Sequence, residues 1–321
     1  MISIKTALTS AAALLNTEEA ALEAQLLLQH VLNVSRAWLI SHESDTLQPN
    51  THAGFEALLI RRLNGEPIAY ILGYREFYGL KLKVTADTLI PRPDTETLVE
   101  AALARTPATS LRAERGNLET GNVAEIASLR SQRLDSRLHG NDREMGAEFK
   151  ILDLGTGTGA IALAIAKHRP QAQITALDAS QAALDIAIEN AENLKIPNVD
   201  FVLSDWFSAL GQKNNPQKFD LIVSNPPYIE ANDTHLSQGD LRFEPRSALA
   251  SGAYGLDAIR HIINNAPPYL NPHGWLMLEH GYNQASKVAT LLKQAWFSDI
   301  SHVKDLAGIE RVTIGRFQVD A

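Results

Sequence analysis

Short apolar runs alternate with stretches of helical periodicity from residue 150 onward, and this alternation most constrains the fold. The expected strands lie at 150–154, 173–177, 200–203, 219–224, 275–279, 300–305 and 311–317. The expected helices lie near 159–168, 180–194, 255–265 and 283–296. Strands that alternate with helices form a parallel sheet with helices on both faces. Only a short Ala307-Gly308 link joins the last two runs, so we expect an α/β fold whose seven-stranded, mostly parallel sheet has an antiparallel last strand.

Residues 1–72 predict a small helical bundle. Residues 17–20 resemble a helix start, and a broad apolar stripe with helical spacing follows as far as Leu32. A second is expected from about 50 to 63 and ends at Asn64-Gly65. The bundle carries no catalytic signature, so it is either structural or a docking domain for a macromolecule.

A hairpin-like linker is expected at 73–90, where aromatic residues combine with period-two alternation. The two prolines of the next segment, Pro91 and Pro93, prevent a helix before them. Either Asp94 or Thr95 can then cap a helix that runs to about Arg105.

Residues 106–148 interrupt the predicted catalytic domain, which spans 91–321. The stretch contains no aromatic residue and has six arginines against seven acidic residues. A compact domain rarely needs so long a connection without structure. We predict a mobile surface insertion with a short helix near 123–130. The alternative, a basic arm for nucleic acid, is disfavoured by the nearly balanced charge.

The composition excludes several classes of protein. The chain has no cysteine, which rules out disulfides, thiolate nucleophiles and cysteine-based metal sites. Its ten histidines show no ligand spacing, so no metal is expected. The net charge of −8 argues against a surface that neutralises many phosphates. No apolar stretch is long enough for a membrane helix and no cleavage site follows the first apolar run, so a soluble, cytoplasmic protein is expected.

A glycine-rich turn joins the first expected strand of this alternating region to a helix. Glycines allow positive φ and close approach of a ligand to the backbone, and the helix start presents free N–H groups. The turn consists of Gly155, Thr156, Gly157, Thr158 and Gly159. By itself it also fits a dinucleotide site or a tight turn without a ligand.

Asp178 ends the next strand, where an acidic side chain can accept both ribose hydroxyls of an adenosine. Alone it would be a helix cap; beside the glycine turn, the ribose role is favoured. Asp205 and Trp206 end the third strand, where they could meet the amino group and the face of an adenine. A tryptophan here could equally belong to the core. No P-loop sequence is present, which disfavours a nucleotide hydrolase.

Four residues after a buried strand form a candidate site for the group to be modified, which we call the acceptor: Asn225, Pro226, Pro227 and Tyr228. The prolines have no N–H, so the Asn225 amide oxygen and the Pro226 carbonyl can both act as acceptors. Two acceptors can orient a planar amide or amine nitrogen and stabilise the positive charge that develops on it during methyl transfer. Tyr228 could pack on the flat face of the acceptor. A proline-terminated strand without chemistry is the other interpretation.

The combination of the glycine turn, Asp178 and Asn225-Pro226-Pro227-Tyr228 resembles the class I methyltransferases, which have a Rossmann-like fold. Within this class, the resemblance is to the enzymes that modify exocyclic amino groups of adenine or side-chain amides of glutamine. The flanking sequences 73–79, 89–96, 243–249 and 278–281 are similar to those of the bacterial peptide chain release factor glutamine methyltransferase family. The similarity covers nearly the whole chain apart from 106–148.

This resemblance implies methylation of N5 of the glutamine in the Gly-Gly-Gln loop of release factors, with S-adenosylmethionine as methyl donor and no metal. It implies that residues 155–159, Asp178 and Trp206 bind the donor. It places Asn225 between donor and acceptor, with the rest of the turn holding the glutamine amide. The N-terminal helices would bind the release factor, and no nucleic acid or membrane partner is expected.

Three alternatives remain at this point. The first is a glutamine methyltransferase of a ribosomal protein, which the contexts 75–77 and 243–245 disfavour. The second is an adenine-N6 nucleic-acid methyltransferase, which the negative charge disfavours. The third is a donor-binding scaffold without catalysis, which would need a degenerate acceptor turn.

Overall fold

The computed structural model describes residues 2–107, 148–211 and 216–318. The helix expected near 123–130 and most of the expected insertion lie outside the described residues. One boundary of that insertion is corrected. Thr106 is buried, and its carbonyl accepts a hydrogen bond from Arg169 Nε at 3.1 Å, so it is the packed end of a helix.

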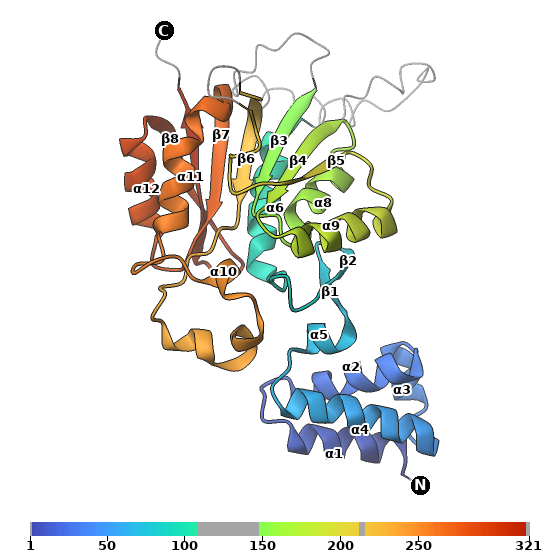
Figure 1. The fold of residues 1–321 in the computed structure, drawn as a ribbon. Coiled ribbons are helices and arrows are strands. Elements are labelled where there is room, and N and C mark those ends of the chain that lie inside the picture. Colours follow the sequence, from blue (N-terminus) through green and yellow to red (C-terminus); the bar gives the residue numbers. More distant parts are fainter. Residues whose placement is uncertain (1, 108–147, 212–215, 319–321) are drawn as a thin grey trace, which may run out of the picture.

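The N-terminal residues form a helical bundle, as predicted (Figure 1). Its helices are α1 (Ile4–Leu14), α2 (Ala20–Leu32), α3 (Arg36–Ser41), α4 (Pro49–Leu63) and α5 (Ile68–Leu72). Leu27, Leu28 and Phe55 are buried in its core, which is separate from the cores of the sheet. The helix start expected within 17–20 lies at Ala20, the end expected at Asn64-Gly65 is confirmed, and Gly65 has a positive φ of 89°.

Strands β1 (Tyr74–Phe77) and β2 (Leu80–Lys83) form the expected antiparallel hairpin. Phe77 and Leu82 of this hairpin are buried in a core shared with the large sheet. The side chain of Asn190 accepts from the backbone N–H of Lys83 at 2.7 Å and donates to its carbonyl at 3.1 Å. The hairpin is therefore packed against the large sheet and bound to Asn190, and it also links the N-terminal bundle to the rest of the chain.

A 3-10 turn, η1 (Pro93–Thr95), leads into α6 (Glu96–Arg105). The expected capping role of Asp94 or Thr95 is wrong, because neither side chain hydrogen-bonds to the start of α6. Asp94 forms an ion pair with Arg311 at 2.8 Å, and Thr95 faces Asn225. Both side chains make tertiary contacts instead.

The sheet has seven strands in the order β5-β4-β3-β6-β7-β9-β8. They are β3 (Phe149–Leu154), β4 (Ala172–Asp178), β5 (Val199–Leu203), β6 (Phe219–Ser224), β7 (Leu270–Glu279), β8 (Phe297–Lys304) and β9 (Glu310–Phe317). The last strand, β9, is antiparallel to both neighbours, which confirms the expected fold class. Strand β7 begins earlier than expected, at Leu270, and its pairing with β6 shifts register near that end.

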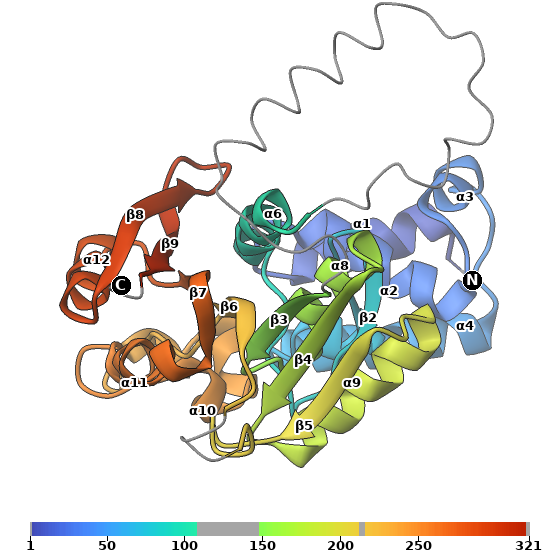
Figure 2. The ribbon, with the colours of Figure 1, turned by 90° about the horizontal axis from the view of Figure 1, so that it is seen from above.

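Helices cover both faces of the sheet (Figure 2). One face packs against α6, α8 (Ala160–His168) and α9 (Gln181–Leu194); the other packs against α11 (Asp257–Asn265) and α12 (Ala285–Gln294). Adjacent residues in a strand alternate between these layers, so Ile151 belongs to one core and Leu152 to the other. No helix of the described ranges is both long and apolar enough to span a membrane.

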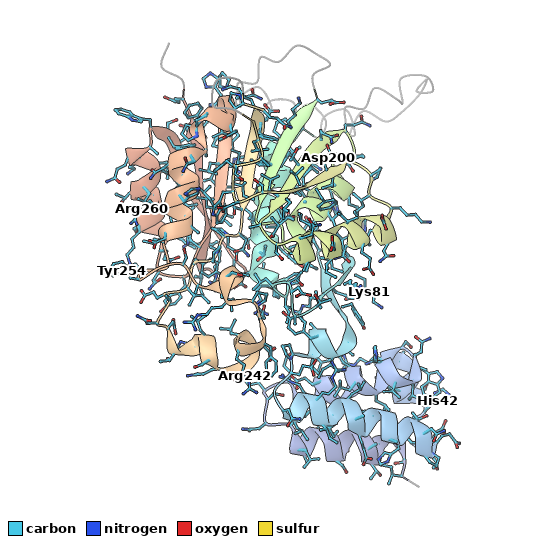
Figure 3. The ribbon with its side chains drawn as sticks, in the orientation of Figure 1. His42, Lys81, Asp200, Arg242, Tyr254 and Arg260 are labelled. Carbon is cyan, nitrogen blue, oxygen red and sulfur yellow. The ribbon has the colours of Figure 1, made fainter. Side chains whose placement is uncertain are left out.

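The segment after β6 carries the short elements η2 (Thr234–Ser237), η3 (Gly239–Phe243) and α10 (Arg246–Leu249), and η4 (Pro267–Tyr269) precedes β7. This segment extends below the sheet toward the N-terminal helices (Figure 1). Arg62 of α4 bonds to Glu23 at 2.8 Å and to Asp240 at 3.0 Å. Arg242, at the junction in Figure 3, donates to the carbonyl of Asn64 at 2.8 Å. The bonds of Asp240 and Arg242 join the bundle to the η3 segment, whereas the bond to Glu23 lies within the bundle.

Candidate active site

A cavity of about 530 Å³ lies at the carboxyl ends of the parallel strands. In open α/β sheets this edge is where ligands bind. Part of the wall comes from positions singled out in the sequence: Gly155, Gly157, Asp178, Asp205, Trp206, Asn225, Pro226 and Pro227. The cavity thus brings together the expected donor site and the expected acceptor turn, which are far apart in the sequence.

The three glycines of the turn have positive φ values of 72° at Gly155, 55° at Gly157 and 81° at Gly159. A Cβ at Gly155 or Gly157 would enter open space, and both residues line the cavity, so these two glycines keep the wall open. A Cβ at Gly159 would lie 3.0 Å from Leu163 and 3.3 Å from Ala187. Gly159 therefore allows α8 to pack against α9 and is not part of the cavity wall.

The two threonines of the turn also lie outside the wall. Thr156 donates to Asp153 Oδ2 at 2.7 Å, and the carbonyl of Thr158 accepts from Asn190 at 3.0 Å. Both threonines are buried. They hold the shape of the turn, so the predicted direct contacts with the methyl donor find no support at Thr156 or Thr158.

Asp153 precedes the turn and is fully buried. Burial raises the pKa of its carboxyl to about 7, against the lowering effect of the hydrogen bond from Thr156. Its other oxygen, Oδ1, has no hydrogen-bond partner among the described residues. Below about pH 7 the protonated, neutral form of this acid is therefore favoured.

The Asp178 carboxylate connects the turn to the next helix. Oδ2 accepts from the backbone N–H of Gly157 at 2.8 Å, and Oδ1 accepts from that of Ser180 at 2.9 Å. Ser180, not Asp178, caps α9, because its hydroxyl accepts from the N–H of Ala183 at 3.2 Å. Asp178 therefore lies in the wall as an acceptor-rich side chain, as the ribose role requires.

Asp205 and Trp206 form the far side of this part of the cavity. Trp206 has a positive φ of 50°, which is uncommon for a bulky residue. Its ring is half-buried against the core that contains α11, with the His261 ring 6.0 Å away. Trp206 thus belongs to the edge of the core and to the cavity wall, which combines the two interpretations of the sequence.

The acceptor turn is bound to its surroundings through Asn225 and Tyr228. Asn225 Nδ2 donates to Thr95 Oγ1 at 3.1 Å. The Tyr228 hydroxyl donates to Glu279 Oε1 at 3.3 Å, and the Tyr228 carbonyl accepts from Gln284 Nε2 at 3.0 Å. Burial raises the pKa of Tyr228 far above its usual value. The cavity wall includes Asn225 and both prolines but not Tyr228, so the expected packing of its ring on an acceptor finds no support.

Two stretches of the wall were not assigned to the site from sequence: residues 86–89, and Pro245 with Ser247 and Ala248. Glu244 joins them, since its carboxylate accepts from the N–H of Ile90 at 2.9 Å and from Arg92. Burial raises the pKa of Glu244 although Arg92 opposes this. Both stretches overlap sequences on which the family resemblance rests, and this overlap could have identified them as part of the site.

The chain matches two protein-family models and is similar in sequence to known proteins. Residues 146–312 match the model of a methyltransferase domain, and residues 6–73 match that of the PrmC N-terminal domain. The chain is 44% identical over 304 residues to the release factor glutamine methyltransferase of Vibrio cholerae, covering 95% of this chain and 92% of that protein. It is 46% identical over 294 residues to that of Xylella fastidiosa, covering 92% of each.

The chain belongs to the release factor glutamine methyltransferase family. The crystal structure of a protein-(glutamine-N5) methyltransferase from Alicyclobacillus acidocaldarius, described as release factor-specific, is of a protein 26% identical to this chain. The comparison covers 72% of this chain and 95% of that one, with a TM-score of 0.37. Within the described ranges, no group of three or more histidine, aspartate or glutamate side chains is arranged to hold a metal ion.

Proposed function

We propose that this chain transfers a methyl group from S-adenosylmethionine to N5 of the glutamine in the Gly-Gly-Gln loop of bacterial release factors. The observation that carries the proposal is the single cavity shared by Gly157, Asp178 and Asn225. A donor site and an amide-binding turn must share one cavity for direct transfer. The relatives at about 44% identity are named release factor glutamine methyltransferases, which supports the choice of substrate.

The cavity wall fits the methyl donor. Gly155 and Gly157 leave open space where side chains would stand, so the donor can approach the backbone closely. Asp178 would accept the ribose hydroxyls, and Asp205 with Trp206 would bind the adenine. Thr156, Thr158 and Gly159 would act through the shape of the turn. S-adenosylmethionine supplies a methyl group on a positively charged sulfur, which becomes a neutral thioether when the methyl leaves.

The acceptor turn supplies orientation. The lone pair of an amide nitrogen is delocalised, so the nitrogen is a weak nucleophile. The Asn225 amide oxygen and the Pro226 carbonyl would accept its two hydrogens and direct the nitrogen at the methyl carbon. As the C–S bond breaks and the N–C bond forms, these acceptors stabilise the charge on nitrogen. The nitrogen then releases one proton to solvent water, which leaves the neutral N-methyl amide.

Catalysis by positioning requires no metal in this scheme. Orientation of two reactants contributes up to roughly 7–11 kcal/mol in favourable cases. We further propose that residues 1–72 form the docking domain, with 73–90 as a linker and 91–321 as the catalytic domain. The net charge of −8 supports a protein substrate over a nucleic acid.

The proposal is tested by incubating the full chain with radiolabelled S-adenosylmethionine and, separately, release factor, ribosomal protein and DNA. Mass spectrometry of the product peptides locates the methyl group. We expect label on the glutamine of the Gly-Gly-Gln loop. Label on nucleic acid alone, or on ribosomal protein alone, would refute the proposed substrate.

A further inference from the structure

Glu279, at the end of β7, is a buried acid that the proposed reaction does not use. Its Oε1 accepts from the Tyr228 hydroxyl at 3.3 Å. The hydroxyl of Thr95 also faces this carboxylate closely enough to lower its pKa. Oε2 has no close hydrogen-bond partner in the described ranges. One buried carboxylate therefore lies behind both ends of the acceptor turn.

Thr95 connects this carboxylate to Asn225. An ionised carboxylate only accepts hydrogen bonds, whereas a hydroxyl has one proton to donate and lone pairs to accept with. When Thr95 donates its proton toward Glu279, its oxygen can accept from Asn225 Nδ2, as observed at 3.1 Å. The Asn225 amide is then held in one of its two orientations, with Oδ1 as the end not bound to Thr95.

That orientation matters for the chemistry of the turn. An asparagine amide that flips would present Nδ2, a donor, where the proposed reaction needs an acceptor for the glutamine N–H. Thr95 is 4% exposed and Glu279 is 1% exposed, so water does not readily replace either partner. The contact joins residues that are 130 positions apart in the sequence.

We propose that Glu279 and Thr95 are positioning residues that fix the orientation of the Asn225 amide, so that its oxygen faces the glutamine to be methylated. The inference rests on the proposed function for its consequence in catalysis. Neither residue touches the reacting atoms: Glu279 acts through Thr95 and Tyr228, and Thr95 acts through Asn225. The effect is expected on turnover, since the donor is bound by other parts of the wall.

The ionisation of Glu279 makes the positioning of the Asn225 amide depend on pH. Burial raises the pKa of Glu279 to about 7, while Thr95, Tyr228 and Arg311 lower it and Asp94 raises it. Arg311 is itself paired with Asp94 at 2.8 Å and with Asp305 at 3.0 Å. Protonated Glu279 can donate a hydrogen bond and no longer forces Thr95 to donate. Turnover should therefore rise with pH through about 7 as Glu279 ionises.

The test compares Thr95→Val with Thr95→Ser. Valine keeps the shape but removes the hydroxyl; serine keeps the hydroxyl. We expect Thr95→Val to lower kcat about 10- to 100-fold, less than the roughly 100- to 1000-fold loss of a group that contacts the reacting atoms, because Thr95 acts through Asn225. The KM for S-adenosylmethionine should stay within about twofold, and Thr95→Ser should retain most of the activity. Equal losses in both variants, or full kcat in Thr95→Val, would overturn the inference.

A second variant, Glu279→Gln, removes the titration. Its kcat should lose the rise near pH 7 that the unmodified protein shows, whereas Glu192→Gln, an exposed change on α9, should keep it. A rise that persists unchanged in Glu279→Gln would contradict the role of this carboxylate.

One measurement does not depend on methyl transfer to a release factor. The side-chain amide resonances of Asn225, assigned by their loss in Asn225→Asp, report its contact with Thr95 directly. They should shift in Thr95→Val and remain near their original positions in Thr95→Ser. Inactivity of the unmodified protein on release factor would refute the proposed function alone. Amide resonances that do not respond to Thr95→Val would refute the positioning role alone.

Discussion

The carboxylate of Asp178 accepts a hydrogen bond from the backbone N–H of Gly157 at 2.8 Å, and this bond joins two parts of the proposed donor site. The glycine turn follows β3, and Asp178 ends the neighbouring strand β4. The second oxygen of Asp178 is bound to the N–H of Ser180 at 2.9 Å. The position of the carboxylate in the cavity is therefore set before any ligand binds.

Asp178→Asn should weaken binding of S-adenosylmethionine. The amide replaces one acceptor oxygen by a donor, which opposes either the N–H of Gly157 or that of Ser180. A hydrogen bond to a charged group contributes about 1.5–3 kcal/mol, so we expect the Kd to rise roughly 10- to 100-fold. Isothermal titration calorimetry measures it. Asp185→Asn, an exposed change on α9, should leave the Kd unaltered. An unaltered Kd in Asp178→Asn would remove this residue from the donor site.

Asn225→Ala separates binding from transfer. The variant loses the amide oxygen proposed to accept from the glutamine, while Gly157 and Asp178 remain. Loss of one preorganised hydrogen-bonding group costs about 100- to 1000-fold in kcat. We expect at least that loss in a methyl-transfer assay, with the donor Kd changed by less than about threefold. Full activity would show that Asn225 does not orient the acceptor.

The local pattern of the sequence predicted the sheet well, and it singled out several residues that line the cavity at the edge of the sheet. Strand and helix periodicities are short-range signals, and β6 (Phe219–Ser224) was predicted to the residue. Gly155 and Asp178 follow strands directly, so parallel topology alone brings them to one edge of the sheet. Strand β7 was predicted too short, because Pro272 and Gly274 near its start are residues that usually interrupt strands.

Contacts between distant segments could not be predicted in this way. Either Asp94 or Thr95 was expected to cap α6, yet Thr95 accepts from Asn225, because the chain path brings η1 close to the residue that follows β6. Glu279 gives no local signal of its own: it is one acidic residue after an apolar run. Its burial beside Tyr228 depends on the packing of β7, and only the folded structure provides that information.

Asp153 should make the stability of the protein decrease with pH. Its folded-state pKa is about 7, raised by burial from the ordinary value of 3.8, so the folded state binds more protons than the unfolded state between these limits. The free energy of unfolding then falls as pH rises through this window, by up to about 1.4 kcal/mol per pH unit for each such group. Urea denaturation at a series of pH values across this window measures the slope.

Asp153→Asn is the matched test, because asparagine resembles the neutral acid and does not titrate. In this variant the free energy of unfolding should fall less steeply with pH. The fall that remains includes the contribution of Glu279, whose pKa is also raised to about 7. Asp185→Asn serves as the exposed control and should retain the full slope. A slope that is identical in Asp153→Asn and the unmodified protein would place the titration elsewhere.

Gly255→Ala should disturb the acceptor turn from behind. Gly255 has a positive φ of 65°, and a Cβ there would overlap the carbonyl oxygen of Tyr228 and lie 2.9 Å from Gln284 Nε2. These two atoms form the hydrogen bond of 3.0 Å that holds the backbone of the turn. Gly308, in the turn between β8 and β9, has a φ of 80°, and a Cβ there would meet nothing within 4 Å. Gly308→Ala therefore carries the backbone strain without the overlap.

Both substitutions place an alanine in the left-handed region, which costs roughly 1–2 kcal/mol. Gly308→Ala should therefore lower stability by about that amount and leave kcat unaltered, whereas Gly255→Ala should lower stability further and reduce kcat by about tenfold or more. Chemical denaturation and the methyl-transfer assay measure the two effects. Equal kcat values in the folded variants would mean that the carbonyl of Tyr228 can move without consequence for the acceptor. A selective loss in Gly255→Ala would show that the turn must be held from its backbone as well as from the side chain of Asn225.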